Sequence, residues 1–227
     1  MLVLIRKRSL IILLSTVFII SFSLGVYKLV AHPMLEKWQE EKTVISRVKT
    51  DKSSGVYELA AHPMLGQWQQ EKIVISRVKT DELVISLTFD DGPVYGKTSA
   101  VLDALQRNQV KGTFFMIGQR VLEQPDLVRR IAQEGHEIGN HSFAHSDYNR
   151  LDTEAQIQDI YRTIEAIKAI TGQQVTLFRP PGGYMSEALI ERCKQEGITI
   201  AHWTYQQDPK DWCDGRSAAY IANYILK

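Results

Sequence analysis

The sequence lacks an excess of charge of either sign. Its 27 lysine and arginine residues are offset by 26 aspartate and glutamate residues, which leaves a formal net charge of +1 over 227 residues. Proteins that bind nucleic acid depend on a positive field to attract the phosphate backbone. The balanced charge therefore argues against a nucleic-acid partner, and we expect none.

Cysteine is also scarce, because the chain contains only Cys193 and Cys213. Two cysteines cannot define the disulfide framework on which small secreted domains depend. In an oxidising compartment the two could still pair, but a free, buried thiol is the interpretation that we favour. With 44% hydrophobic and 23% charged residues, the chain has the composition of a globular protein.

An uncharged apolar segment lies near the N-terminus. Residues 9–27 form a run of 19 residues without a charged side chain, and Arg6-Lys7-Arg8 precede it. At a rise of about 1.5 Å per residue, such a helix just spans a hydrocarbon core of roughly 30 Å. The basic cluster predicts that its own end stays in the cytoplasm and that the rest of the chain is exported.

Residues 1–28 are therefore expected to form a cytoplasmic basic cluster and a transmembrane anchor. The protein would then be a single-pass protein of the cell membrane with its folded domain outside. Small residues at Ser21 and Ser23, or at Ser23 and Gly25, also fit a signal-peptidase site. Cleavage there would give a secreted protein, so both localisations stay open, and we prefer the anchor.

A tandem repeat follows this segment. Residues 26–51 recur with near identity as residues 56–81, at a period of 30. Two copies are fewer than the three or so that a solenoid requires, so we interpret residues 29–75 as a duplicated stalk or linker. The second copy runs directly into the following domain, residues 76–227, and is the copy that we expect to have a packing partner.

Strand and helix patterns alternate from residue 82 onward. This alternation predicts an α/β fold with a parallel sheet, open or closed into a barrel, whose chemistry lies at the carboxyl ends of the strands. A capping-box pattern at Thr153 and Gln156 opens the longest helix, and Gly172 closes it. The predicted strands are 82–89, 112–118, 136–140, 175–180 and 198–205, and the predicted helices are 99–109, 125–135, 153–172, 186–197 and 217–226.

Polar side chains gather where four of the predicted strands end. Segments far apart in the sequence thus deliver chemical groups to one rim of the sheet, as an active site requires. In chain order, these groups are Asp90 with Asp91, His141 with His145, Arg179, and Asp208 with Asp211.

The two histidines of this set have a spacing that suits a metal. His141 and His145 lie four residues apart, which places two imidazoles on one side of a helical turn. With a carboxylate from another strand end they would supply three ligands and leave a fourth position open for water. This is the pattern of a catalytic rather than a structural zinc site. His136, in EGHEI, precedes its strand and is assigned a structural role.

Four short motifs resemble those of a known family. TFDDGP, HSFAH, FRPPGG and DPKDW occur in that order and are similar to the successive motifs of the polysaccharide deacetylases, the NodB homology domain of carbohydrate esterase family 4. The resemblance covers roughly residues 76–212. It implies a distorted (β/α) barrel and metal-dependent removal of N-acetyl, sometimes O-acetyl, groups from a polysaccharide such as peptidoglycan or chitin.

The resemblance also implies roles for the residues of the first three motifs. Asp90 would be the general base, and Arg179 would pair with it. Asp91, His141 and His145 would bind the metal, which is usually zinc in this family, with cobalt or nickel as substitutes.

The third and fourth motifs further imply a substrate pocket. The backbone N–H of Gly182, directly after Arg-Pro-Pro, would stabilise the oxyanion. Many members have an aromatic residue at that position, whereas here Gly182 and Gly183 precede Tyr184, which would alter the rim. Asp211 would tune a catalytic histidine, and Trp212 would form the wall of the acetyl pocket.

The fifth motif of the family, a leucine and a histidine at the end of a late strand, has no counterpart in the sequence. In the family that histidine protonates the departing amine, and here no histidine follows His202. The stretch 82–227 is also shorter than the roughly 200 residues or more of an ordinary barrel. We therefore expect a barrel without its last strand or strands, a monomer, and little or no amide turnover by the 227-residue form.

Two alternative functions stay open. The chain could be an inactive, membrane-tethered, glycan-binding remnant of a deacetylase, or a product without function. Binding of glycan oligomers without release of acetate would favour this alternative. Aspartates after a strand also serve phosphoryl-transfer enzymes, but those generally combine carboxylates two residues apart with a lysine and magnesium.

Overall fold

The computed structural model describes residues 5–6, 64–77, 84–203, 211, 213 and 215–225. Apart from Ile5–Arg6, the predicted anchor (1–28) lies outside the described residues, as do the first repeat copy and Trp212. Ile5–Arg6 form β1, which pairs antiparallel with β3 (Val84–Ile85). No helix in the part of the chain that the structure describes is long and apolar enough to cross a bilayer.

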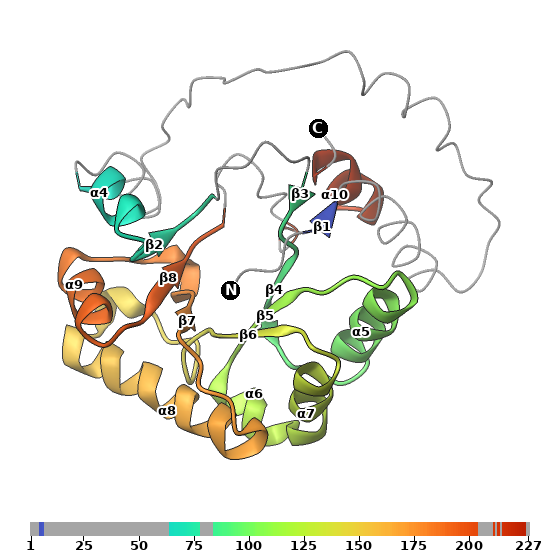
Figure 1. Cartoon of the computed structure of the whole chain (residues 1–227), viewed down its shortest axis with the longest axis horizontal. Coiled ribbons are helices and arrows are strands. Elements are labelled where there is room, and N and C mark those ends of the chain that lie inside the picture. The colour runs from blue at the N-terminus through green and yellow to red at the C-terminus, as the bar shows by residue number, and fades with distance from the viewer. Residues whose placement is uncertain are drawn as a thin grey trace, which may run out of the picture.

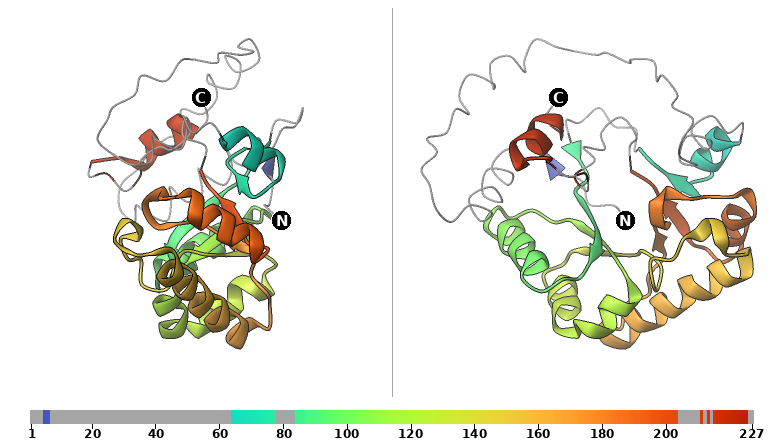
Figure 2. Two further views of the ribbon diagram at one scale, coloured as in Figure 1. Left: turned by 90° about the vertical axis from the view of Figure 1, so that its left-hand side faces the viewer. Right: turned by 180° about the vertical axis from the view of Figure 1, so that it is seen from behind.

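Six short strands form one parallel sheet in the order β2-β8-β7-β6-β5-β4. In Figure 1 the strands form an arc with helices on its outer side, and Figure 2 shows the same arc from behind. The strands are β2 (Val74–Ile75), β4 (Thr88–Gly92), β5 (Thr113–Met116), β6 (Glu137–Asn140), β7 (Leu177–Phe178) and β8 (Thr199–Ala201).

This topology confirms the predicted α/β fold with a parallel sheet. The predicted distorted barrel is not confirmed, because β2 and β4 form the two edges of the sheet and no pairing joins them within the described residues. Because the strands are parallel, their carboxyl ends lie along the same rim of the sheet, where polar groups from separate segments can meet.

The longer helices lie where amphipathic periodicity predicts them. They are α5 (Lys97–Arg107), α7 (Pro125–Gln133), α8 (Thr153–Thr171), α9 (Glu187–Gln195) and α10 (Ala218–Ile225). Two short helices, α4 (Leu65–Gln70) and α6 (Gly118–Glu123), are not indicated by the sequence, since one or two turns are too few for a period to show. Two 3-10 turns, η1 (Tyr148–Arg150) and η2 (Pro181–Gly183), complete the elements.

The first predicted strand, 82–89, is wrong in its bounds. Residues 84–85 form β3, whereas β4 begins only at Thr88 and continues through Asp90 and Asp91. Apolar alternation runs through the break, so periodicity alone does not reveal it. The later strand carries both aspartates to its carboxyl end.

The structure confirms the predicted C-terminal end of α8 and corrects the predicted N-terminal cap. Gly172 adopts the left-handed conformation, with φ of 71°, and ends the helix as predicted. The N-terminal cap is Asp152 instead of Thr153, because the Asp152 carboxylate accepts a hydrogen bond from the backbone N–H of Ala155. The Gln156 side chain is buried, its Nε2 donates to the carbonyl of Tyr148 and its Oε1 accepts no hydrogen bond, so no capping box forms.

The core divides between the two faces of the curved sheet. Side chains alternate along β5, so Phe114 packs among the helices while Phe115 joins Leu177 and Ala201 in a separate buried group. The helix layer contains two clusters. One lies around α5 and α7, and the other joins α4, α8 and α9 to β7 and β8.

The end of the second repeat copy belongs to this core. Trp68 is 2% exposed and packs in the cluster of α8 and α9, β2 pairs with β8, and Lys194 forms an ion pair of 2.8 Å with Glu71. The linker interpretation of residues 29–75 therefore does not extend to 65–75. Trp68 covers apolar surface because the outer side of β8 would otherwise be open.

Replacing Trp68 with alanine should lower the free energy of unfolding by about 3 to 5 kcal/mol, as expected when a large aromatic side chain is removed from a core. Trp38 has the same place in the first copy, and Trp38→Ala is the matched control, with an expected change within about 0.5 kcal/mol. Urea unfolding followed by circular dichroism measures both. Equal effects of the two substitutions would contradict this assignment.

Candidate active site

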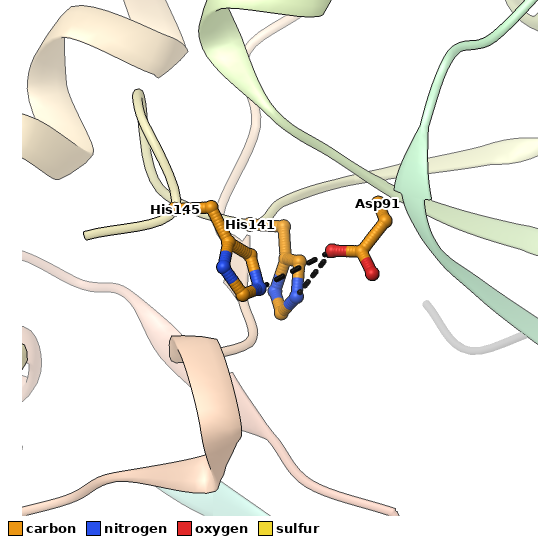
Figure 3. A group of neighbouring side chains, drawn as sticks. All are labelled: Asp91, His141 and His145. Carbon is orange, nitrogen blue, oxygen red and sulfur yellow. Dashed lines mark ion pairs between the residues drawn. The ribbon is translucent and has the colours of Figure 1, made fainter. Parts of the chain in front are cut away.

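Three predicted metal ligands meet at the carboxyl ends of β4 and β6. The Nε2 atoms of His141 and His145 lie 3.4 Å and 3.2 Å from Oδ1 of Asp91. One ligand atom from each residue lies within 4.8 Å of the other two. Figure 3 shows the two imidazoles turned toward the same carboxylate.

The adjacent carboxylates of β4 are separated by an irregularity in the sheet. Phe89 pairs with Phe114 and Gly92 with Met116, so the stretch between them holds one residue more in β4 than in β5. Such a bulge changes the direction of a side chain that regular pleating would turn to the opposite face. This is how Asp90 and Asp91, neighbours in sequence, both come to the rim.

The loop that carries the histidines is not the helical turn that their spacing predicts. Residues 141–147 contain no helix, and Ser142 and His145 adopt positive φ angles of 68° and 54°. Asp91 also has a positive φ, of 64°. Non-glycine residues in this region are strained, and such strain is found where surrounding contacts impose a geometry that a site requires.

His141 is fixed by a hydrogen bond on its far side. Its Nδ1 lies 2.7 Å from the backbone carbonyl oxygen of Arg179, so this nitrogen carries the proton and donates it. Nε2 is then the ring nitrogen that faces Asp91. The hydrogen bond with His141 holds the pKa of Asp91 below its usual range, against the opposing effect of partial burial.

Asp90 lies beside this group and pairs with a buried cation. Nη1 of Arg179 lies 2.7 Å from Oδ1 of Asp90 and 2.8 Å from the Thr88 hydroxyl, and Nε donates to the carbonyl of Ala201. Burial lowers the pKa of Arg179, and the Asp90 carboxylate opposes that effect. The predicted pair of Asp90 and Arg179 is therefore brought together.

The Arg179 guanidinium stacks on an aromatic ring. The central carbon of the guanidinium, Cζ, lies 4.0 Å from the centroid of the Phe115 ring. The ring in turn lies against Gly139, where an added Cβ would come within 2.4 Å of a Phe115 ring carbon. Only a residue without a side chain fits in this place on β6.

The turn after Arg179 offers a backbone donor. Gly182 and Gly183 both have positive φ, of 61° and 73°. The N–H groups of Gly183 and Tyr184 are used within the turn, donating to the carbonyls of Pro180 and Pro181. The N–H of Gly182 is not part of that pattern, and Gly182 is exposed. Tyr184 is half-buried and packs against the cluster of α8 and α9.

His202, for which the motifs predict no role, lies against this turn. It is 5% exposed, its Nε2 lies 3.4 Å from the carbonyl oxygen of Gly183, and its Nδ1 lies 3.2 Å from that of Trp203. A Cβ on Gly183 would come within 2.5 Å of Nε2. No motif marks His202, because its place depends on how β8 and η2 pack.

The fourth motif and the cysteines are only partly described. Asp211 is exposed, and Asp208 and Trp212 lie outside the described residues, so the roles of Asp211 and Trp212 stay predictions. Cys193 and Cys213 are both free, in agreement with the favoured interpretation. Burial raises the pKa of the Cys193 thiol to about 12, which makes it unreactive.

The ligand group fits a divalent transition metal. Two imidazole nitrogens and one carboxylate oxygen are a donor set of catalytic zinc, and the hydrogen bond from His141 Nδ1 to a carbonyl is the outer contact that such ligands usually make. The site is open, since the Asp91 and His145 side chains are 58% and 42% exposed. A fourth ligand could therefore reach the centre from solvent.

His202 should make stability depend on pH. Burial lowers its pKa to about 4, against about 6.5 in an unfolded chain, so the unfolded state binds the proton first as the pH falls. Protonation of His202 in the unfolded state should by itself lower the free energy of unfolding by roughly 3 kcal/mol between pH 7 and pH 4. In urea unfolding, the free energy of unfolding of His202→Gln should fall less between pH 7 and pH 4 than that of the wild type. A smaller fall should persist in this variant, because burial also lowers the pKa of His136. An unchanged slope would refute this effect.

Comparison with known proteins identifies the family. Residues 77–201 match the family model described as polysaccharide deacetylase. A peptidoglycan-N-acetylglucosamine deacetylase of Bacillus cereus is 38% identical over 146 residues, covering 64% of this chain and 68% of that protein. The peptidoglycan-N-acetylmuramic acid deacetylase PdaA of Bacillus subtilis is 44% identical over 125 residues, covering 54% and 47%. The chain thus spans about two thirds of one relative and about half of the other.

A solved structure gives the same result. The crystal structure of the peptidoglycan N-acetylglucosamine deacetylase Bc1960, in complex with an N-hydroxybenzamide compound, superimposes with a TM-score of 0.66 at 31% identity. The match covers 70% of this chain and 73% of that one. The resemblance drawn from the four motifs is confirmed, and the chain belongs to the polysaccharide deacetylase family of carbohydrate esterases.

Proposed function

We propose that this protein hydrolyses N-acetyl groups of a cell-wall polysaccharide, and that peptidoglycan is the first substrate to test. The observation that carries the proposal is the contiguity of two groups at one rim. These are the possible metal ligands Asp91, His141 and His145, and the Asp90–Arg179 pair. The names of the relatives support peptidoglycan, since both curated proteins reported above act on it. Removal of O-acetyl groups is a related possibility at the same site.

Asp91, His141 and His145 would hold the metal, for which we propose zinc, with cobalt or nickel as substitutes. Zinc would acidify a water molecule and polarise the acetyl carbonyl. The openness of the site supports a polymer as substrate, because a glycan chain can lie across an exposed rim without entering a closed cavity. Asp91 and His145 are the ligands that face that side.

The residues around this centre have separate tasks. Asp90 accepts a proton from the water that attacks the acetyl carbon. Arg179 fixes the orientation of Asp90 through a buried contact of 2.7 Å and cannot itself act as a base. The N–H of Gly182 donates to the negative oxygen that develops on the carbonyl.

The state of His202 favours a second candidate function, glycan binding without turnover. The departing amine requires a proton, and His202 interacts with both Asp90 and Arg179. Burial lowers its pKa to about 4, so at neutral pH it is uncharged and carries no extra proton to give to the amine. Turnover would require Asp90 to return the proton that it accepted, or a donor from outside the described residues. Glycan binding by the wild-type chain without acetate release would establish this candidate.

We further propose that residues 9–27 attach the protein to the cell membrane as a monomer with its deacetylase domain outside. The uncharged length of the segment and the preceding basic cluster support this. Cleavage after the segment would instead give a secreted protein. Fractionation of cells that produce the full chain, followed by protease treatment of intact cells, separates the two. Retention of the whole chain in the cytosol would contradict both.

Two neighbouring substitutions should separate the proposed tasks. Asp90→Asn should reduce acetate release from N-acetylated peptidoglycan by about 10² to 10⁴-fold, because it removes the base. It should leave Co²⁺ affinity nearly unchanged, since Asp90 is not in the ligand group. Asp91→Asn should lose both metal affinity and activity. Titration with Co²⁺ and an acetate assay measure the two effects.

The matched control is Asp126→Asn, an exposed carboxylate on α7 that should affect neither quantity. Chelation of the wild-type protein should abolish acetate release, and added Zn²⁺ should restore it. Full metal affinity in Asp91→Asn would contradict the proposed ligand set. Activity that survives both chelation and Asp90→Asn would contradict the proposed mechanism.

A further inference from the structure

The loop that carries the metal-binding histidines is held between two helices. On one side, the first turn of α6 donates from the N–H groups of Gly118 and Gln119 to the carbonyls of Ser142 and Phe143, at 3.0 Å and 2.9 Å. Gly118 permits this approach because an added Cβ would lie 2.5 Å from the Phe143 ring. The carbonyl oxygens of the loop are therefore fixed from α6.

On the other side, a carboxylate on α8 fixes one backbone N–H of the loop. Oδ2 of Asp159 accepts hydrogen bonds from the backbone N–H of Phe143, at 2.7 Å, and from the hydroxyl of Tyr148, at 3.0 Å. Tyr148 is 1% exposed, so the second bond joins the carboxylate to the core. Asp159 thus reaches the loop midway between His141 and His145.

Further contacts from α8 act at the same point. The Arg162 guanidinium, one turn along α8, stacks on the Phe143 ring at 3.8 Å from its centroid. Asn140 accepts from the N–H of Ser142 and donates to the carbonyl of Ile160 on α8. These contacts surround Phe143, but Asp159 supplies the charge-assisted bond to the loop backbone between the histidines.

The loop needs such a support because its conformation is strained. Ser142 and His145 have positive φ angles, and a free loop of this sequence would relax toward negative ones. Relaxation would move the imidazoles relative to each other and to Asp91, which comes from a different strand. Contacts that orient metal ligands from outside typically contribute 10- to 100-fold to metal affinity.

We propose that Asp159 is a positioning residue for the metal centre, which sets the separation of His141 and His145 by holding the Phe143 amide. The proposal rests on the proposed function, since it requires that these histidines bind metal. Asp159 contacts neither the metal ligands' side chains nor the substrate rim. Its effect is expected on affinity and coordination geometry, and on activity only as a consequence.

The test compares Asp159→Ala, Asp159→Asn and the control Glu165→Gln, an exposed carboxylate on α8. Asp159→Ala should weaken Co²⁺ binding by about 10- to 100-fold and alter the visible absorption of bound Co²⁺. Asp159→Asn keeps an acceptor oxygen without the charge and should lie between Asp159→Ala and wild type. Glu165→Gln should match wild type. Thermal unfolding verifies that each variant is folded at the temperature of measurement, and Asp159→Asn serves if Asp159→Ala is not.

A second measurement does not depend on metal. In the metal-free protein, the amide of Phe143 should exchange its hydrogen faster in Asp159→Ala than in wild type or Glu165→Gln. Wild-type Co²⁺ affinity in Asp159→Ala would overturn the proposal while leaving the proposed function intact. Absence of Co²⁺ binding by wild type would overturn the proposed function and the positioning role together, and the exchange rates would still show whether Asp159 holds the loop.

Discussion

The site depends on one buried cation. Arg179 donates from its guanidinium to Asp90 on β4 and to the carbonyl of Ala201 on β8, while its own carbonyl accepts from His141 and its N–H donates to Asn140. One residue directly after β7 therefore connects β4, β6 and β8 to the end of its own strand. A buried guanidinium is costly unless its donors are satisfied, so each of these contacts stabilises the position of the others.

The contacts of Arg179 reach both parts of the candidate site, the carboxylate of Asp90 and the possible metal ligand His141. The side chain of Arg179 orients the proposed base, and its main chain orients the proposed metal ligand His141. Arg179 thus fixes the positions of Asp90 and His141 relative to each other. A shift of β7 along its neighbours would move Arg179 and so displace Asp90 and His141 together. The position of this strand therefore matters to the site although the strand has only two residues.

Much of this could be predicted from the sequence. The alternation of patterns gives the parallel sheet, because strand and helix periods differ. The histidine pair and a strand-end carboxylate were predicted from residue type and spacing, whereas the choice of Asp91 over Asp90 as the proposed ligand came from the family resemblance. The pairing of Asp90 with Arg179 came from resemblance, because 89 residues separate the two and no local pattern connects them.

The remaining features depend on contacts that have no sequence signal. The bulge that turns Asp91 to the rim is a property of how β4 pairs with β5, and the positive φ angles of the histidine loop depend on its support from α6 and α8. The spacing of His141 and His145 suggested a helical turn because it was considered without these neighbours. The burial of Trp68 likewise depends on α9 and β8, which lie more than a hundred residues further along the chain.

Gly139 shows how far the demands of the site reach into the sheet. It has no functional group, yet its missing side chain leaves room for the Phe115 ring, and that ring lies under the cation that orients Asp90. A single methyl group added at Gly139 on β6 would push the ring toward the guanidinium and so disturb Asp90 through two intermediate residues. The space that Gly139 leaves on β6 therefore serves an ion pair whose carboxylate lies on β4.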